Sequence, residues 1–184
     1  MKEALLVIDV QNIYFQGPLK ITFPPESFGN IQKVMDHAAA RAIPVVVIQH
    51  GASALGGGFS RGSENWKLHP EIEKRHRDVL IEKTLPGSFT GTNLEEWLKT
   101  RGIERVVISG YMTQMCCDTT ARQALHLGYK VIFLSDATGT LAVENQEGRI
   151  EDKDLHKAVL ITQAMRFSEV KTAGEWMDSN QSSG

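Results

Sequence analysis

Hydrophobic residues along the chain gather into short runs that alternate with longer segments of helical spacing. The runs are rich in branched aliphatic residues and too short for helices, which is typical of strands buried on both faces of a parallel sheet. These predicted strands lie at residues 4–8, 45–48, 79–81, 106–108 and 131–134, with a candidate edge strand at 167–170. Apolar residues three and four positions apart predict helices at about 28–42, 93–101, 114–127 and 154–165.

This alternation predicts an α/β fold, because strand–helix–strand units place consecutive strands parallel in one sheet. We expect a three-layer αβα, Rossmann-like fold with a mostly parallel sheet of about six strands and helices on both faces. Gly102 and Gly128 each stand between a predicted helix and the next strand, as glycines that end helices do. Ligands of such folds bind beyond the carboxyl ends of the strands, so residues that follow strands are the first candidates for chemistry.

The length of the chain suits one domain with a sizeable core. It has 184 residues, of which 41% are hydrophobic and 23% are charged. We expect the domain to span residues 1–177, followed by a disordered polar tail at 178–184. The glycine-rich segment from Gly51 to Trp66 is predicted to be a long loop that closes over a pocket.

Charge and apolar patterning exclude several classes of partner. The formal net charge of −2, without a run of like charge, argues against nucleic acid binding. No apolar stretch reaches the roughly 20 residues that span a bilayer, and a strand pattern at the very start argues against a signal peptide. The two cysteines, Cys116 and Cys117, are adjacent and cannot form a disulfide framework, so the cytoplasm is the expected compartment.

Reactive side chains follow three of the predicted strands. Asp9 comes after the first strand, Lys83 after the third, and Cys116 opens the helix after the fourth. The first turn of a helix favours a thiolate, because the dipole and the free N–H groups stabilise negative charge. Each residue alone has a simpler interpretation, as a turn cap, a solvated lysine or a core thiol. Their shared position at one edge of a sheet instead suggests a nucleophile, a base and an electrostatic partner.

Other polar residues near these positions are predicted to be structural. Cys117 lies about 100° round the helix from Cys116, so only one thiol can face a site, and we expect Cys117 to pack inward. His50, His69 and His156 are interpreted as hydrogen-bonding residues, with His69 and the following proline starting a helix.

Three segments resemble the isochorismatase-like cysteine hydrolases, the superfamily that includes nicotinamidases and N-carbamoylsarcosine amidases. Residues 6–15 carry a D-x-Q pattern at Asp9 and Gln11, and residues 83–92 begin with Lys83. Residues 110–121 match the pattern G-x-x-T-x-x-C-x-x-x-T-A, with its cysteine at Cys116. Segments 62–70 and 135–137 are similar more weakly, and the similarity covers nearly the whole chain in the expected order.

The resemblance implies a catalytic triad of Asp9, Lys83 and Cys116. It also implies a non-proline cis peptide at Tyr111–Met112 and an oxyanion hole formed by the backbone N–H groups of Met112 and Cys116. The implied reaction is hydrolysis of a C–N bond in a small amide or carbamoyl compound, through a thioester on the cysteine. The candidate pocket residues are Gln11, Tyr14, Phe15, His50, Trp66 and Phe89.

The sequence departs from the metal-binding members of this superfamily. Nicotinamidases hold a metal with an Asp-x-His pair and a later histidine, and those positions are here His50, Ala52 and about Gly58. A single imidazole is a poor metal site, so we expect no metal and no cofactor. The resemblance further implies a homo-oligomer, dimeric or larger. Alternative hypotheses are an isochorismatase-type vinyl ether hydrolase, a redox-active thiol protein, and a non-catalytic member that binds a small molecule.

Overall fold

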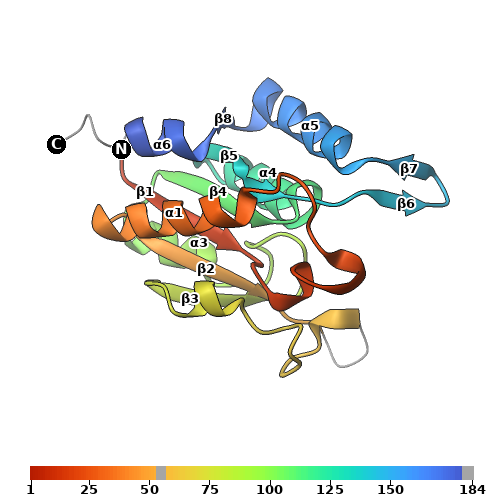
Figure 1. The fold of residues 1–184 in the computed structure, drawn as a ribbon. Coiled ribbons are helices and arrows are strands. Elements are labelled where there is room, and N and C mark those ends of the chain that lie inside the picture. Colours follow the sequence, from red (N-terminus) through yellow and green to blue (C-terminus); the bar gives the residue numbers. More distant parts are fainter. Residues whose placement is uncertain (53–56, 180–184) are drawn as a thin grey trace.

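A six-stranded parallel sheet forms the centre of the protein (Figure 1). The structure is a computed structural model that describes residues 1–52 and 57–179. The strand order is β3-β2-β1-β4-β5-β8, and all neighbouring strands are parallel. The strands are β1 (Glu3–Ile8), β2 (Val45–His50), β3 (Val79–Lys83), β4 (Arg105–Tyr111), β5 (Lys130–Gly139) and β8 (Glu169–Lys171).

Helices of different lengths lie between these strands along the chain, except for the last helix, which follows β8. They are α1 (Ser27–Ala40), α2 (Pro70–Glu73), α3 (Leu94–Thr100), α4 (Asp118–His126), α5 (Asp152–Thr162) and α6 (Ala173–Ser179). The shorter turns are the 3₁₀ segments η1 (Asn12–Tyr14), η2 (Gly17–Leu19) and η3 (Gly57–Phe59) and the π-helical segments η4 (Thr113–Cys117) and η5 (Gln163–Phe167). In the described part of the chain, the length and hydrophobicity needed to cross a membrane are not met by any helix.

The two faces of the sheet each carry a separate apolar core. Leu5 and Val7 of β1 belong to the core under α1 and α6, whereas Leu6 and Ile8 belong to the core under α3 and α4. Successive side chains of a strand point to opposite faces, so a strand apolar at every position needs helices on both sides. Figure 1 shows α1 and α6 in front of the sheet and α3 and α4 behind it. The predicted three-layer α/β fold is therefore confirmed.

The structure differs from the predicted elements at exposed or irregular places. A two-stranded ribbon, β6 (Val143–Asn145) with β7 (Gly148–Ile150), extends away from the layers in Figure 1 and was not predicted. Most of its residues are exposed, so it lacks the apolar alternation that marks a half-buried strand. Helix α6 continues to Ser179, so the first two residues of the predicted tail are helical. The rest of that tail, and residues 53–56 of the predicted lid loop, lie outside the described residues.

Strands β1 and β4 approach each other closely at their carboxyl ends, at Ile8 and Gly110. Gly110 has φ +114, and a Cβ atom built on it would lie 2.0 Å from the Ile8 carbonyl oxygen. Only glycine fits there, because both the backbone conformation and the space exclude a side chain. The next residue after Ile8, Asp9, has φ 52, a left-handed conformation that aspartate tolerates better than most residues. This local geometry turns the chain sharply at the carboxyl end of β1.

Candidate active site

The three strand-end residues converge at the carboxyl edge of the sheet. The Lys83 ammonium nitrogen lies 2.7 Å from Asp9 Oδ2 and 3.3 Å from Cys116 Sγ. The side chains of Asp9 and Lys83 are both fully buried, and Cys116 is 8% exposed. Buried charges persist where they are paired, and the Asp9–Lys83 contact supplies that pairing. The arrangement therefore presents one sulfur with an ammonium group beside it and a carboxylate within the same cluster.

The sheet topology explains why residues far apart in sequence meet here. Asp9 follows β1 directly, and Lys83 is the last residue of β3, where its register partner is His50 at the end of β2. Cys116 lies in η4, the turn that leads from β4 into α4. The sequence indicated a cysteine in the first turn of an α-helix, and the structure instead places it in a π-helical turn just before α4. Such π-turns are rare and occur frequently at functional sites.

Burial controls the protonation of this cluster. Burial raises the pKa of the Cys116 thiol, the Asp9 carboxylate raises it further, and Lys83 only partly opposes this effect. Burial also raises the pKa of Asp9, although Lys83 acts in the opposite direction. For Lys83, burial lowers the pKa, but Asp9 and Cys116 together outweigh burial and raise it. These directions favour a protonated thiol and a charged lysine, and they make the ionised form of Asp9 a stronger proton acceptor than a free aspartate.

The two adjacent cysteines have different surroundings. Cys116 contacts Lys83, whereas Cys117 is fully buried in the core shared with α3 and α4. The pKa of Cys117 is raised well above its ordinary value, chiefly by burial, which makes this thiol a poor nucleophile. The expected inward packing of Cys117 agrees with its position. Within the described residues both cysteines are free thiols.

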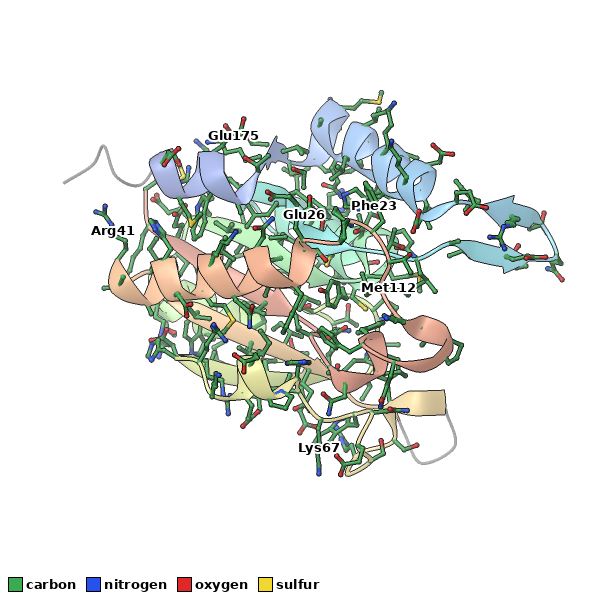
Figure 2. The ribbon with its side chains drawn as sticks, viewed as in Figure 1. Phe23, Glu26, Arg41, Lys67, Met112 and Glu175 are labelled. Atoms are coloured by element: carbon green, nitrogen blue, oxygen red, sulfur yellow. The ribbon has the colours of Figure 1, made fainter. Side chains whose placement is uncertain are left out.

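The backbone before the cysteine contains the feature that the resemblance implied. The peptide bond between Tyr111 and Met112 is cis. Met112 immediately precedes η4, and its carbonyl oxygen accepts hydrogen bonds from the N–H groups of Met115 (3.1 Å) and Cys117 (3.3 Å). Arg41 directly follows the C-terminal end of α1, and Figure 2 shows Met112 far from it. Met112 and Cys116 are thus parts of one compact turn at the carboxyl edge.

The Gln11 side chain links two backbone segments by hydrogen bonds, although the sequence suggested that it lines a pocket. Its side chain is fully buried, and its Nε2 donates to the carbonyl oxygens of His50 (2.9 Å) and Trp66 (2.6 Å). Its Oε1 accepts a hydrogen bond from the backbone N–H of His50 (2.9 Å). With its amide engaged by the backbone on both sides, Gln11 joins the end of β2 to the segment around Trp66. Sequence reasoning identified the position but not this role.

The aromatic pocket candidates lie in two different places. Tyr14 packs edge-to-face on Tyr111, with ring centroids 5.7 Å apart, and Phe15 packs on the same ring at 6.1 Å. Both therefore lie near the turn that carries Met112. Phe89, by contrast, stacks on Tyr129 at 5.9 Å. Because Tyr129 directly precedes β5, Phe89 packs toward the amino edge of the sheet, away from the triad.

His50 lies inside the cluster, beside the lysine. Its Nδ1 is 3.2 Å from the Lys83 ammonium nitrogen, and its ring packs edge-on against Phe59 with centroids 4.9 Å apart. An ammonium group beside Nδ1 disfavours a metal cation at that nitrogen. Of the other two positions that bind metal in nicotinamidases, Ala52 and Gly58 carry no ligand atoms in their side chains. Across the described ranges, His, Cys, Asp and Glu side chains form no group of three suited to a metal ion.

The remaining histidines hold parts of the structure. His69 accepts a hydrogen bond from the N–H of Glu71 (3.2 Å) and caps α2, as its sequence context predicted. His156 is buried between Thr113, the first residue of η4, at 2.9 Å and the carbonyl oxygen of Ser135 at 2.8 Å. The sequence marked Thr113 only as part of a motif and gave no signal that His156, more than forty residues later, is its partner.

The family of the chain follows from comparison with known proteins. The isochorismatase domain family matches residues 3–165. The chain belongs to the isochorismatase family of hydrolases. The family protein YddQ of Bacillus subtilis is 30% identical over 94% of this chain and 97% of its own length. Nicotinamidase 3 of Arabidopsis thaliana is 30% identical over 90% of this chain and 82% of its own, and the ureidoacrylate amidohydrolase RutB of Agrobacterium fabrum is 26% identical over 73% and 75%.

Solved structures agree with this family assignment. An isochorismatase-family structure from Burkholderia xenovorans superposes with a TM-score of 0.95 at 41% identity, covering 98% of this chain and 88% of that one. A cysteine hydrolase from Pseudomonas syringae superposes with a TM-score of 0.90 at 26% identity, covering 98% and 93%. The chain thus shares its fold and its hydrolase family with these proteins, and the similarity extends over nearly the whole of each chain.

Proposed function

We propose that the chain is a cysteine-dependent hydrolase that cleaves the C–N bond of a small amide or carbamoyl compound. The observation that carries this proposal is the contact of one lysine with both a buried carboxylate and a thiol, at 2.7 and 3.3 Å. A thiol, a proton acceptor and a fixed positive charge are the groups that nucleophilic acyl transfer requires. The amidohydrolase among the relatives is consistent with this chemistry.

In the proposed mechanism, Asp9 accepts the thiol proton of Cys116 while Lys83 stabilises the thiolate. The sulfur attacks the carbonyl carbon, and the oxygen that becomes negative is bound by the backbone N–H groups of Met112 and Cys116. The tetrahedral intermediate collapses as Asp9 returns the proton to the departing ammonia or amine. Water then attacks the thioester, releasing the acid and restoring the thiol.

Three other functions remain as alternatives. A vinyl ether hydrolase of the isochorismatase type has no need of a nucleophilic cysteine, so the contact between Lys83 and Cys116 favours amide cleavage. A redox protein commonly separates its two cysteines by two residues, and here one member of the adjacent pair, Cys117, is fully buried. A non-catalytic member that binds a small molecule would show neither hydrolysis nor a fast thiol.

The deciding experiment is an assay of ammonia release over a panel of small primary amides, ureido compounds and carbamoyl compounds. We expect the wild-type protein to hydrolyse at least one class, Cys116→Ala to lose turnover by a factor of 10³ or more, and Cys117→Ala to retain it. Matching thermal unfolding curves would establish that the Cys116 variant is folded. Turnover by Cys116→Ala at the wild-type rate would refute the mechanism.

The biological setting is part of the proposal and is supported by the composition of the chain and by the family resemblance. We propose a single catalytic domain over residues 1–177 that works in the cytoplasm as a homo-oligomer, with a small molecule as substrate and without metal, cofactor or nucleic acid. Gel filtration with light scattering would test the oligomeric state. Elemental analysis of the purified active protein would test the metal.

A further inference from the structure

Four acceptors surround the single ammonium group of the site. Lys83 Nζ lies 2.7 Å from Asp9 Oδ2, 3.1 Å from the Leu85 carbonyl oxygen, 3.2 Å from His50 Nδ1 and 3.3 Å from Cys116 Sγ. An ammonium group has three protons and no acceptor capacity. One of the four groups is therefore left without a proton from Lys83 at any moment.

The four groups differ in how strongly each accepts a hydrogen bond from the Lys83 ammonium. The Asp9 carboxylate is charged and closest, and the Leu85 carbonyl oxygen belongs to the backbone beside Lys83 itself, so neither is easily displaced. A neutral thiol is a weak acceptor, whereas a thiolate is a strong one. His50 and Cys116 are consequently the two acceptors available to the third N–H group of Lys83.

The contact also fixes the tautomer of His50. Because Lys83 can only donate, Nδ1 of His50 must be the accepting nitrogen, and the ring proton lies on Nε2. Burial and the charge of Lys83 lower the pKa of His50, so the imidazole is neutral and able to accept. A neutral histidine in this position contacts the lysine without adding charge.

We propose that His50 competes with Cys116 for the Lys83 ammonium and thereby keeps the thiol protonated until substrate is bound. This inference rests on the proposed role of Cys116 as the nucleophile. His50 then acts as a positioning residue that works through Lys83. When the thiolate forms, Lys83 exchanges its bond to His50 for one to the sulfur, while the thiol proton passes to Asp9. The resting enzyme is in this way less exposed to adventitious alkylation and oxidation.

Two substitutions at position 50 distinguish the effect of the hydrogen-bond acceptor from the effect of the ring. His50→Phe keeps a ring against Phe59 and removes the acceptor, while His50→Asn loses the ring but offers Oδ1 at the same distance along the side chain as Nδ1. The measurement is the pH dependence of iodoacetamide alkylation at Cys116, with the label located by tandem mass spectrometry and Cys116→Ala as the blank.

We expect His50→Phe to shift the alkylation midpoint downward by about one pH unit, a gain of about tenfold in rate at a fixed pH below the midpoint. His50→Asn should stay within a few tenths of a unit of the wild type. The other titratable groups that face the cluster are Asp9 and Lys83 from the strand ends, Tyr14 from η1 and Cys117 from η4, and all of them are the same in both variants.

A midpoint in His50→Phe that is unchanged or higher, or an equal shift in both variants, overturns the proposal. If either variant fails to fold, ¹⁵N NMR of the wild-type protein tests the same point, because a protonated Nδ1 on His50 contradicts the competition. The assay reads the thiol directly and requires no turnover. Failure of the hydrolase assignment, seen as activity in Cys116→Ala, is therefore distinguishable from failure of this inference.

Discussion

At the scale of single residues, we expect the buried carboxylate of Asp9 to set the pH dependence of the proposed reaction. In the proposed mechanism Asp9 must be ionised to accept the thiol proton, so kcat/KM falls as the pH drops through its pKa. Burial raises that pKa above the ordinary value of aspartate, and the acid limb of the pH profile should lie correspondingly higher than for a free aspartate.

The test is the pH profile of kcat/KM on whichever amide the screen identifies. Asp9→Asn should lose activity by about 10³-fold or more and show no acid limb, because an amide cannot accept the proton. Asp36→Asn is the matched control, since Asp36 is an exposed carboxylate paired with Arg75 on the protein surface. An acid limb that persists in Asp9→Asn would assign the limb to another group.

The catalytic candidates could be predicted from sequence because their position depends only on strand order. Asp9, Lys83 and Cys116 lie at or beyond the carboxyl ends of three strands, and parallel strands bring those ends to one edge whatever the details of packing. The roles of Gln11 and Phe89 could not be predicted in this way. Which backbone groups Gln11 joins, and that Phe89 turns toward Tyr129, depend on contacts between distant segments that no local pattern records.

At the scale of elements, the turn η4 contains Cys116, the proposed nucleophile, and contacts a side chain from α5. Thr113 begins this turn and hydrogen bonds to His156 at 2.9 Å, while the other ring nitrogen of His156 donates to the Ser135 carbonyl oxygen. Burial lowers the pKa of His156, which keeps the ring neutral and leaves one nitrogen to accept from Thr113. The hydrogen bond thus connects α5 to the active-site turn.

Removing this hydroxyl should loosen the turn. We expect Thr113→Val to lower kcat by about tenfold and the free energy of unfolding by about 1–3 kcal/mol, because the buried His156 acceptor loses its partner. Thr113→Ser keeps the hydroxyl and should recover most of both quantities. Steady-state kinetics and urea unfolding measure the two effects. A Val variant with wild-type kcat, or a Ser variant equally impaired, would show that the turn does not depend on this bond.

The elements themselves were predictable to the extent that burial dictates their periodicity. Strands such as β1 and β2, and helices such as α1 and α3, have strong patterns because their apolar residues are buried. The ribbon β6–β7 has exposed residues and therefore little pattern, and the π-turn η4 has a helical spacing that does not distinguish it from α4. Irregular elements thus escaped prediction although one of them carries the cysteine.

At the scale of the whole molecule, α6 contacts the first strand, β1, and so connects segments far apart in the sequence. Trp176 of α6 is fully buried, and its Nε1 donates to Glu3 of β1 at 3.1 Å. Glu3 also forms an ion pair with Arg105 at the start of β4. These contacts lie at the amino edge of the sheet, whereas Asp9, Lys83 and Cys116 lie at the carboxyl edge.

Truncating this tryptophan should therefore affect stability and leave catalysis alone. We expect Trp176→Ala to lower the free energy of unfolding by about 3–5 kcal/mol, while Trp176→Phe, which loses the hydrogen bond but keeps much of the packing, costs less. Urea unfolding gives the stability, and kcat/KM at a temperature where each variant is folded gives the activity. A Trp176→Ala protein as stable as the wild type would contradict the connecting role.

The separation of the two edges has a practical consequence. Strand β1 begins and α6 ends at the same side of the molecule, as Figure 1 shows. Asp9, Lys83 and Cys116 lie at the opposite, carboxyl edge of the sheet. A protein tethered to a bead, a sensor surface or a fusion partner through either of those ends would have the edge that holds Cys116 on the side away from the support. The same layout makes it suited to immobilised labelling with carbonyl or alkylating probes.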